Sequence, residues 1–268
     1  MQVYGILGHP VAHSRSPAMQ RAAFDALGIA AHYDHFDILP TDLATFMQQV
    51  REEKIAGLSV TIPHKIEITQ YLDEIDSAAQ AIGAVNTVYW QGDQLVGTNT
   101  DWQGAVDALE EIEKIAGKEI AVLGTGGAAR AVVYGLQQRG AGQIYVFGRD
   151  EAKLAGLATD FGIETAPWDH FVTFEPDIVI HATPLGLAGE HELASPISPG
   201  YFRFRQPLVY DLIYSPAETL LLREAAIAGC RTLGGLGMFV RQGAAQFTIW
   251  TGKDAPVELM QQVAKKQL

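Results

Sequence analysis

The chain has 268 residues, of which 48% are apolar and 19% are charged, so it is long and apolar enough for two folded domains and is not a disordered protein. Its formal net charge of −12 argues against nucleic acid or an anionic membrane as a partner. No apolar run reaches the roughly 18 residues of a membrane span, the N-terminal residues lack a secretory signal pattern, and a single cysteine, Cys230, excludes an intramolecular disulfide. We therefore expect a cytoplasmic protein without a membrane partner, in which Cys230 is a small buried side chain.

In the first hundred residues, strands and helices are predicted from the spacing of the apolar side chains. Residues 2–8 form a predicted strand, and Ser16 followed by Pro17 fits the N-cap and first position of a helix, with Ser14 on the loop before it. The other predicted elements are a strand over 32–39, a helix after Thr41, a strand over 55–63, helical segments over 64–75 and 77–83, and a hairpin over 84–97.

Two titratable residues stand at the ends of these predicted elements. Lys65 follows Pro63 at the carboxyl end of a strand, which is where open α/β sheets bind their ligands. Asp101 follows the hairpin at the start of a helix, where either it or Thr100 would also serve as an N-cap. A lysine paired with a carboxylate is a suitable couple for moving a proton.

From Lys118 onward, strands alternate with helices, which predicts a doubly wound parallel sheet. The stretch KEIAVLGTGGAAR opens it, and the spacing of Gly124, Gly126 and Ala129 fits the G-x-G-x-x-G/A turn that binds a pyrophosphate at a helix N-terminus. The further predicted elements are helices over 128–140, 151–162, 218–230, 238–252 and 256–268, and strands over 143–147, 176–184, 207–216 and near 232.

The choice of dinucleotide depends on the residues after the second strand of this sheet. An arginine there can hold the 2′-phosphate of NADP, whereas a carboxylate can accept a hydrogen bond from the ribose 2′-hydroxyl of NAD. The chain has both, Arg149 and Asp150, and Lys153 lies one helical turn further on. Asp150 would alternatively cap the helix that follows. We favour NADP, with NAD left open because of Asp150.

Other chemistry has little support in the sequence. His9 and His13 are separated by Pro10 and do not share a helical face, and there is no HExxH motif or cysteine cluster, so we expect no catalytic metal. A GxSxG elbow is also missing, which argues against acyl transfer. Redox chemistry on a small molecule remains.

Six segments, read together and in order, closely resemble the shikimate dehydrogenase family, whose members reversibly reduce 3-dehydroshikimate to shikimate with NADPH. The segments are GHPVAHSRSP, LSVTIPHK, AVNTV, GTNTDWQG, LGTGGAAR and GGLGMFVRQGA, and the resemblance runs over essentially the whole chain. The resemblance implies an enzyme of the shikimate pathway of aromatic amino acid biosynthesis. It also implies two α/β domains: a substrate domain from residues 1–101 and 238–268, and a Rossmann-like dinucleotide domain from residues 102–237.

The resemblance further implies a role for individual residues. Lys65 would transfer the proton with Asp101 as its partner. The shikimate carboxylate would be bound by Ser14 and Ser16 with Tyr214 near it, and the ring hydroxyls by Thr61, Lys65, Asn86, Asp101 and Gln242. The pyrophosphate would be surrounded by Gly124, Gly126, Gly127 and Ala128, and the 2′-phosphate by Arg149 and Lys153. Thr183, Gly235 and Met238 would lie near the ribose and nicotinamide.

Two positions depart from the family pattern. Many members have asparagine where this chain has Ser59, and commonly Asn-Arg-Thr where this chain has Gly148-Arg149-Asp150. A carboxylate at position 150 would repel a 2′-phosphate. An NAD-dependent quinate/shikimate dehydrogenase is therefore the nearest alternative. A tetrahydrofolate dehydrogenase and a dinucleotide-sensing regulator without turnover are the more distant ones. We expect a monomer or a homodimer.

Overall fold

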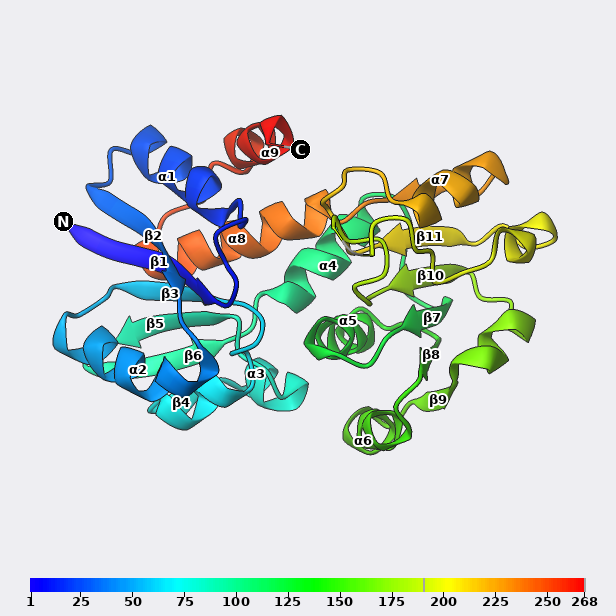
Figure 1. The fold of residues 1–268 in the computed structure, drawn as a ribbon, viewed down its shortest axis with the longest axis horizontal. Helices are drawn as coiled ribbons and strands as arrows, with labels where there is room; N and C mark the ends of the chain where they lie inside the picture. Colours follow the sequence, from blue (N-terminus) through cyan, green and yellow to red (C-terminus); the bar gives the residue numbers. More distant parts are fainter. Residues whose placement is uncertain (190, 268) are drawn as a thin grey trace. The chain divides into compact units, whose positions relative to one another are not determined.

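The chain divides into two compact units (Figure 1). The computed structural model describes residues 1–189 and 191–267. The first unit consists of Met1–Thr100 and Val240–Gln267, and the second of Asp101–Phe239. Each contains a six-stranded sheet with helices packed on it, so both are α/β. None of the helices in the described ranges is long and apolar enough to cross a membrane.

The sheet of the first unit has the strand order β2-β1-β3-β5-β6-β4. Its strands are β1 (Gln2–Gly8), β2 (Ala31–Asp37), β3 (Gly57–Val60), β4 (Glu74–Ile75), β5 (Thr87–Gln91) and β6 (Gln94–Thr98). Its helices are α1 (Ser16–Ala26), α2 (Leu43–Glu52), α3 (Ser77–Ile82) and α9 (Val257–Lys266), with most of α8 (Leu236–Thr251) and the 3-10 turns η1 (Pro40–Asp42) and η2 (Glu67–Tyr71).

Alternation along the strands gives this sheet two apolar faces. On one face, Leu7, Leu58 and Val88 pack with the apolar side of α2. On the other, Tyr4 stacks on Phe24 of α1 with ring centroids 5.1 Å apart and contacts Trp250 of α8 at 5.2 Å. The indole of Trp250 also donates to the carbonyl of Val88 at 3.0 Å, which attaches the last helices of the chain to the first sheet.

Strand direction brings several element ends to one edge of this sheet. Strand β3 runs parallel to β1, β5 runs antiparallel to β3, and β6 runs antiparallel to β5. The carboxyl ends of β1, β3 and β6 therefore lie at the same edge as the amino end of β5. Ser59, Thr87 and Thr98 are partners across three neighbouring strands at this edge.

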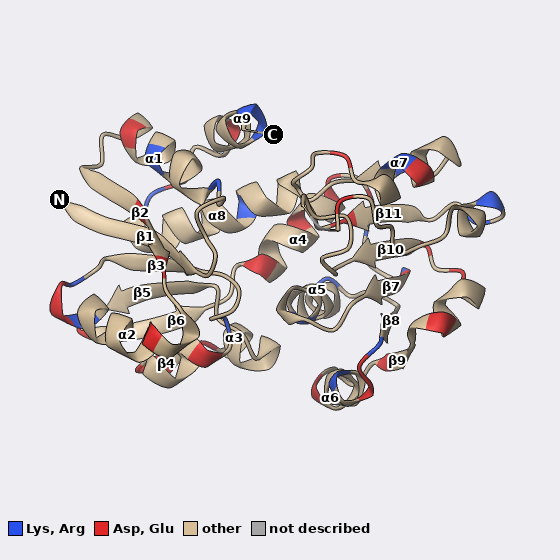
Figure 2. Cartoon of the chain, in the orientation of Figure 1, with Lys and Arg blue, Asp and Glu red and all other residues tan. Residues whose placement is uncertain are grey.

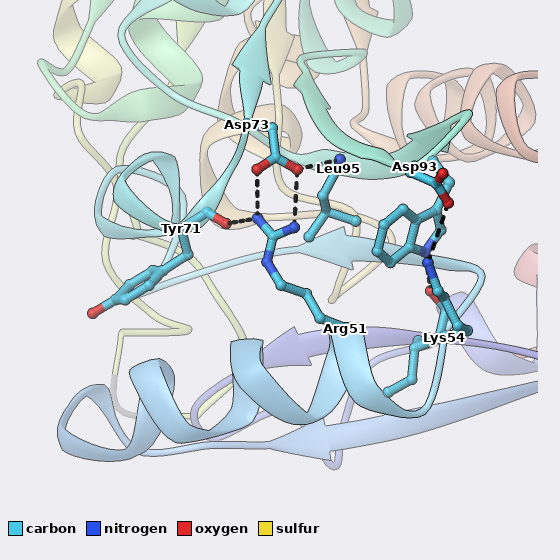
Figure 3. Close-up of polar contacts among 8 residues, drawn as sticks. Arg51, Lys54, Tyr71, Asp73, Asp93 and Leu95 are labelled. Carbon is cyan, nitrogen blue, oxygen red and sulfur yellow. Dashed lines mark hydrogen bonds and ion pairs between the residues drawn. The ribbon is translucent and has the colours of Figure 1, made fainter.

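The segment 64–75 differs from the predicted helix, because it forms η2 and the short strand β4. Arg51 of α2 holds it: the guanidinium donates to both carboxylate oxygens of Asp73 at 2.9 and 3.0 Å and to the carbonyl of Tyr71 at 2.8 Å (Figure 3). Asp73 also exchanges hydrogen bonds with the backbone of Leu95 in β6. The hydrogen bond from Arg51 is the main cause that lowers the pKa of Asp73. Long-range bonds thus override the local helical pattern.

The second unit has an all-parallel sheet with the order β12-β11-β10-β7-β8-β9. The strands are β7 (Glu119–Leu123), β8 (Gln143–Gly148), β9 (Glu164–Pro167), β10 (Ile178–His181), β11 (Leu208–Asp211) and β12 (Thr232–Leu233). The helices are α4 (Asp101–Glu110), α5 (Gly127–Gln138), α6 (Glu151–Phe161) and α7 (Leu220–Ile227), with the 3-10 turns η3 (Trp168–Thr173) and η4 (Pro199–Arg203). Strand β9 was not among the predicted elements.

Alternate residues of these strands pack against different helical layers, as a doubly wound fold requires. Ile120 and Val122 of β7 join a core with α4, α5 and α6, whereas Ala121 and Leu123 join a core with η3, η4 and α7. The chain adds strands on one side of β7 and then returns to add β10 on the other. The carboxyl ends of β7 and β10 therefore form the topological switch point, where such folds bind ligands.

The prediction for Cys230 is confirmed. Its side chain is buried in the α7 layer, and this burial raises the pKa of the thiol.

Candidate active site

Asn86 is the centre of a polar cluster at the edge where β1, β3 and β6 end. Its side-chain oxygen accepts hydrogen bonds from the backbone N–H of Thr100 at 2.8 Å and from the hydroxyl of Thr87 at 2.7 Å. Its side-chain nitrogen donates to the hydroxyl of Thr100 at 3.0 Å. The N–H of Thr100 can only donate, so the side-chain atom of Asn86 that it contacts must be the oxygen. The orientation of the Asn86 amide is therefore determined by its protein neighbours.

Lys65 lies on a segment that backbone hydrogen bonds attach to the same edge of the first sheet. The N–H of Thr61 extends the pairing with β1 by donating to Leu7 at 2.9 Å, and the carbonyl of Lys65 accepts from Val85 at 2.8 Å, next to Asn86. Between them, the fully buried His64 contacts the carbonyl of Ile38 through Nε2 at 2.7 Å. Thr61, Lys65 and Asn86 are thereby brought to one place.

The two serines lie where α1 begins. Helix α1 starts at Ser16 with Arg15 at the N-cap position and no side-chain cap, so the interpretation of Ser16 as a cap is wrong. The hydroxyl of Ser14 accepts from the N–H of Ser16 at 3.3 Å, so the two residues lie together. The helix N-terminus beside them favours an anionic ligand such as a carboxylate.

A buried chain of hydrogen bonds runs from Tyr33 to the Asn86 cluster. The Tyr33 hydroxyl donates to Ser59 at 2.6 Å, and Ser59 donates to the side-chain oxygen of Gln246 at 2.6 Å. The nitrogen of Gln246 donates to the Thr87 hydroxyl and to the carbonyl of Asn86, both at 3.1 Å. Burial raises the pKa of Tyr33, which keeps the phenol protonated as the first donor. Ser59, the first departure from the family pattern, therefore accepts one hydrogen bond and donates the next in this buried series.

Replacing Gln246 with methionine is expected to destabilise the protein by about 2–4 kcal/mol. Methionine keeps much of the side-chain volume but leaves the hydroxyls of Ser59 and Thr87 with fewer buried partners, and an unsatisfied buried polar group costs roughly 1–3 kcal/mol. Urea unfolding followed by tryptophan fluorescence measures the loss.

The control for this variant is Thr248→Ala, an exposed position on the same helix. It should change stability by less than about 0.5 kcal/mol. Equal stabilities of the Gln246 and Thr248 variants would contradict a stabilising role for the buried chain.

Gln242 contacts the Asn86 cluster through its backbone carbonyl, and Asp101 directly follows the cluster residue Thr100 in the sequence. The carbonyl of Gln242 accepts from the Thr100 hydroxyl at 3.1 Å, which joins α8 to the residue before Asp101. Asp101 is the first residue of α4 and is 6% exposed. Gln242 and Gln246 are one helical turn apart, the spacing that places both on one side of α8.

The glycine turn of the second unit has the geometry of an anion-binding loop. Gly124 follows β7 with φ +124°, a conformation that disfavours other residues, and a Cβ there would lie 2.8 Å from the carbonyl of Ala182. Gly126 is the N-cap of α5 and makes no side-chain cap, and a Cβ there would meet nothing within 4 Å. The N–H groups of Gly127 and Ala128 begin the helix. The backbone conformation of this turn and the open space beside Gly126 therefore fit a bound pyrophosphate.

The residues after β8 combine both charges (Figure 2). Arg149 is exposed at the end of the strand. Asp150 is the N-cap of α6: its carboxylate accepts from the N–H of Lys153 at 3.1 Å and pairs with the Lys153 ammonium at 3.5 Å. This backbone hydrogen bond is the main cause that lowers the pKa of Asp150, so the carboxylate is charged at neutral pH. The prediction that Asp150 caps the helix after it is confirmed.

The remaining predicted cofactor residues, Thr183, Gly235 and Met238, follow β10 and β12, and the predicted substrate residue Tyr214 follows β11. Thr183 lies against the glycine turn, because a Cβ on Gly124 would be 3.1 Å from its methyl group. Gly235 passes so close to the backbone of Leu212 that no side chain would fit. Tyr214 stacks on Phe239 with ring centroids 4.4 Å apart, and Met238 is buried in the core of the second unit.

Several polar residues at these edges were missed from the sequence. They are Tyr33, Thr100, Gln246, His181 and Asp211. The spacing of Gln242 and Gln246 was an available signal for one of them. The pairings of Tyr33 with Ser59 and of His181 with Asp211 join residues 26 and 30 positions apart, and no local pattern signals them.

Comparison with known proteins agrees with this architecture. Residues 6–88 match the model of the shikimate dehydrogenase substrate binding domain, residues 235–265 that of the shikimate 5′-dehydrogenase C-terminal domain, and residues 119–190 that of the coenzyme F420-dependent NADP oxidoreductases.

Full-length relatives agree as well. Shikimate dehydrogenase (NADP+) of Oleidesulfovibrio alaskensis is 42% identical over 256 residues, which is 95% of this chain and 91% of the relative. The structure of shikimate 5-dehydrogenase from Thermus thermophilus in complex with NADP(H) and shikimate superimposes with a TM-score of 0.91 at 35% identity, over 100% of both chains. A shikimate dehydrogenase in complex with NADP+ gives 0.91 at 39% identity, over 99% of this chain and 95% of the other. This chain belongs to the shikimate dehydrogenase family.

Proposed function

We propose that this chain is an NADP-dependent shikimate dehydrogenase of the cytoplasm, which reversibly reduces 3-dehydroshikimate to shikimate. The observation that carries the proposal is the match over 95% of the chain to a relative named for this activity and for NADP+. The NAD-dependent quinate alternative is not favoured, because the relatives are named for NADP+.

In this proposal, one region of the chain binds the substrate and another binds the dinucleotide. Residues 1–101 and 238–268 form the substrate domain, and residues 102–237 form the dinucleotide domain. The two compact units support this division, since one carries the Asn86 cluster and the other the glycine turn. The ligands are small molecules, and the protein acts as a monomer or a homodimer.

The substrate is bound by hydroxyl, amide and charged groups of the first region. Ser14 and Ser16, beside the N-terminus of α1, bind the carboxylate, and Tyr214 of the second region lies near it. Thr61, Asn86 and Gln242 orient the ring hydroxyls, because the amide of Asn86 is already fixed by Thr87 and Thr100. Such pre-formed polar groups reduce the cost of ordering the site on binding.

Lys65 and Asp101 handle the proton. When bound, NADPH supplies the hydride that reduces the substrate ketone at its carbon. The Lys65 ammonium gives a proton to the ketone oxygen, which becomes the hydroxyl of shikimate, and in the reverse direction the lysine amine takes that proton back. Asp101 stabilises the charged form of Lys65. The nucleotide is bound by Gly124, Gly126, Gly127 and Ala128 at the pyrophosphate, by Arg149 and Lys153 at the 2′-phosphate, and by Thr183, Gly235 and Met238 near the ribose and nicotinamide.

The test is the initial rate of NADP+ reduction, followed at the absorbance band of the reduced nicotinamide. Shikimate should support turnover with a kcat/KM for NADP+ well above that for NAD+, and quinate should be the poorer substrate. A protein that binds NADP+ but shows no shikimate-dependent rise in absorbance would be a dinucleotide sensor, and the proposal would be rejected.

A further inference from the structure

A buried acid–base pair stands at the switch point of the second sheet, outside the residues assigned above. His181 is the last residue of β10 and Asp211 the last of β11, and the two are direct partners in the parallel register. Both side chains are 0% exposed, and Nδ1 of His181 lies 3.0 Å from the Asp211 carboxylate.

Strand alternation explains why these two side chains meet. Val179 and Val209, two residues earlier in each strand, point into the apolar layer under α7. His181 and Asp211 therefore point to the same side of the sheet, just beyond that apolar layer. At this buried position, a histidine and an aspartate must form hydrogen bonds, because a buried polar group without a partner lowers the stability of the folded protein.

The Asp211 carboxylate accepts three hydrogen bonds from this unit. Besides His181, it accepts from the N–H of Ile213 at 3.0 Å and from the hydroxyl of Thr219, the N-cap of α7, at 2.6 Å. Because a carboxylate only accepts, the His181 imidazole donates from Nδ1. This hydrogen bond sets both the tautomer and the orientation of the ring.

The other side of the ring faces a predicted cofactor residue. Nε2 of His181 lies 2.5 Å from the hydroxyl oxygen of Thr183, which also accepts from the N–H of Leu185 at 3.3 Å. Thr183 is the residue whose methyl group lies against Gly124 of the glycine turn. His181 is itself in register with Leu123, the residue before that turn.

We infer that Asp211 and His181 are positioning residues that orient the Thr183 hydroxyl toward the dinucleotide. A neutral imidazole that donates from Nδ1 has a lone pair at Nε2, so the Thr183 hydroxyl donates to it. The Thr183 oxygen then presents a lone pair to the ligand and takes a donor, either a ribose hydroxyl or a carboxamide N–H. This inference rests on the proposed function, because it takes the ligand at this turn to be a nicotinamide dinucleotide.

Two substitutions at one position separate the two contacts of the ring. In His181→Asn, the short amide places an N–H near the position of Nδ1 and keeps Asp211 but does not reach Thr183. In His181→Gln, the longer amide reaches the position of Nε2 and keeps the contact with Thr183. His181→Asn should raise the Kd for NADP+ by about 3- to 10-fold, the value of one hydrogen bond, and His181→Gln should restore binding to within about 2-fold. Calorimetric titration of NADP+ in the absence of substrate measures both.

A double-mutant cycle shows whether His181 acts through Thr183. In a Thr183→Val background, the hydroxyl is already absent, so adding His181→Asn should leave the Kd for NADP+ unchanged. A purely structural role would instead weaken binding equally in both backgrounds, and thermal unfolding of all variants accompanies the titrations.

The outcomes distinguish this inference from the proposed function. If the wild type binds and reduces NADP+ with shikimate but His181→Asn binds NADP+ as tightly as the wild type, or loses affinity equally in the Thr183→Val background, only the positioning role is overturned. If the wild type binds NADP+ without turnover, the proposed function fails while the positioning role is still measured.

Discussion

Replacing Lys65 with alanine is expected to lower kcat by roughly 10²- to 10⁴-fold, the usual contribution of a positioned general acid or base. The segment that carries Lys65 is held by backbone bonds from Thr61 to β1 and from Val85 to Lys65 itself, and alanine leaves both intact. The loss should therefore appear in turnover, while the Kd for NADP+ and the unfolding temperature stay close to the wild type. Steady-state kinetics with shikimate and calorimetric binding of NADP+ measure the two parts.

A matched lysine serves as the control for this variant. Lys253 is exposed beyond the end of α8, so Lys253→Ala removes the same charge outside the proposed site and should retain wild-type turnover. Near-normal kcat in Lys65→Ala would remove Lys65 from the proton-transfer role, whatever the outcome for the cofactor.

Replacing Arg149 with alanine is expected to raise KM for NADP+ by roughly 10- to 100-fold and to change KM for NAD+ by less than about 3-fold. A charge-assisted hydrogen bond from a guanidinium to a phosphate is among the stronger polar contacts, and only NADP has the 2′-phosphate. Arg149 is exposed where β8 ends, so alanine there removes little packing. Initial rates with both cofactors at saturating shikimate give the ratio. An equal effect on the two cofactors would reject the phosphate role.

Asp150→Asn is the matched variant, and it should change the preference for NADP+ over NAD+ in the direction opposite to Arg149→Ala. Asparagine caps a helix as well as aspartate does, so the bond from the N–H of Lys153 and the start of α6 are preserved. The change removes the negative charge beside the proposed phosphate position and releases the Lys153 ammonium from its 3.5 Å ion pair. The preference for NADP+ over NAD+ should therefore increase by a few-fold. A lower preference would indicate that Asp150 contributes to binding rather than opposing it.

Much of the site was accessible from sequence because its residues follow strands. Lys65 after β3, the glycine turn after β7, Arg149 after β8 and Thr183 after β10 all stand at the carboxyl ends of predicted strands. Within one sheet, parallel strands bring these ends to one edge, so the order of the elements predicts a shared location for the glycine turn, Arg149 and Thr183 in the second sheet, whereas Lys65 follows a strand of the first. The helix capped by Asp150 was also one of the predicted alternatives.

Two of the errors and omissions have the same physical cause, namely bonds between residues that are distant in sequence. The segment 64–75 has a helical pattern, but Arg51 and the backbone of Leu95 hold Asp73 in another conformation. The same applies to Ser59, whose hydroxyl is bound by Gln246, 187 positions away.

Local sequence was sufficient for the two α/β halves, the phosphate turn and the family, because strand and helix periodicity and short motifs depend on neighbouring residues. The hydrogen-bond partners of Asn86 and the alignment of His181 with Asp211 required the folded sheets. Their positions depend on register, which couples residues about 14 to 160 apart in the first unit and 30 apart in the second. A one-residue change of register would turn Asp211 away from His181 without altering any local pattern.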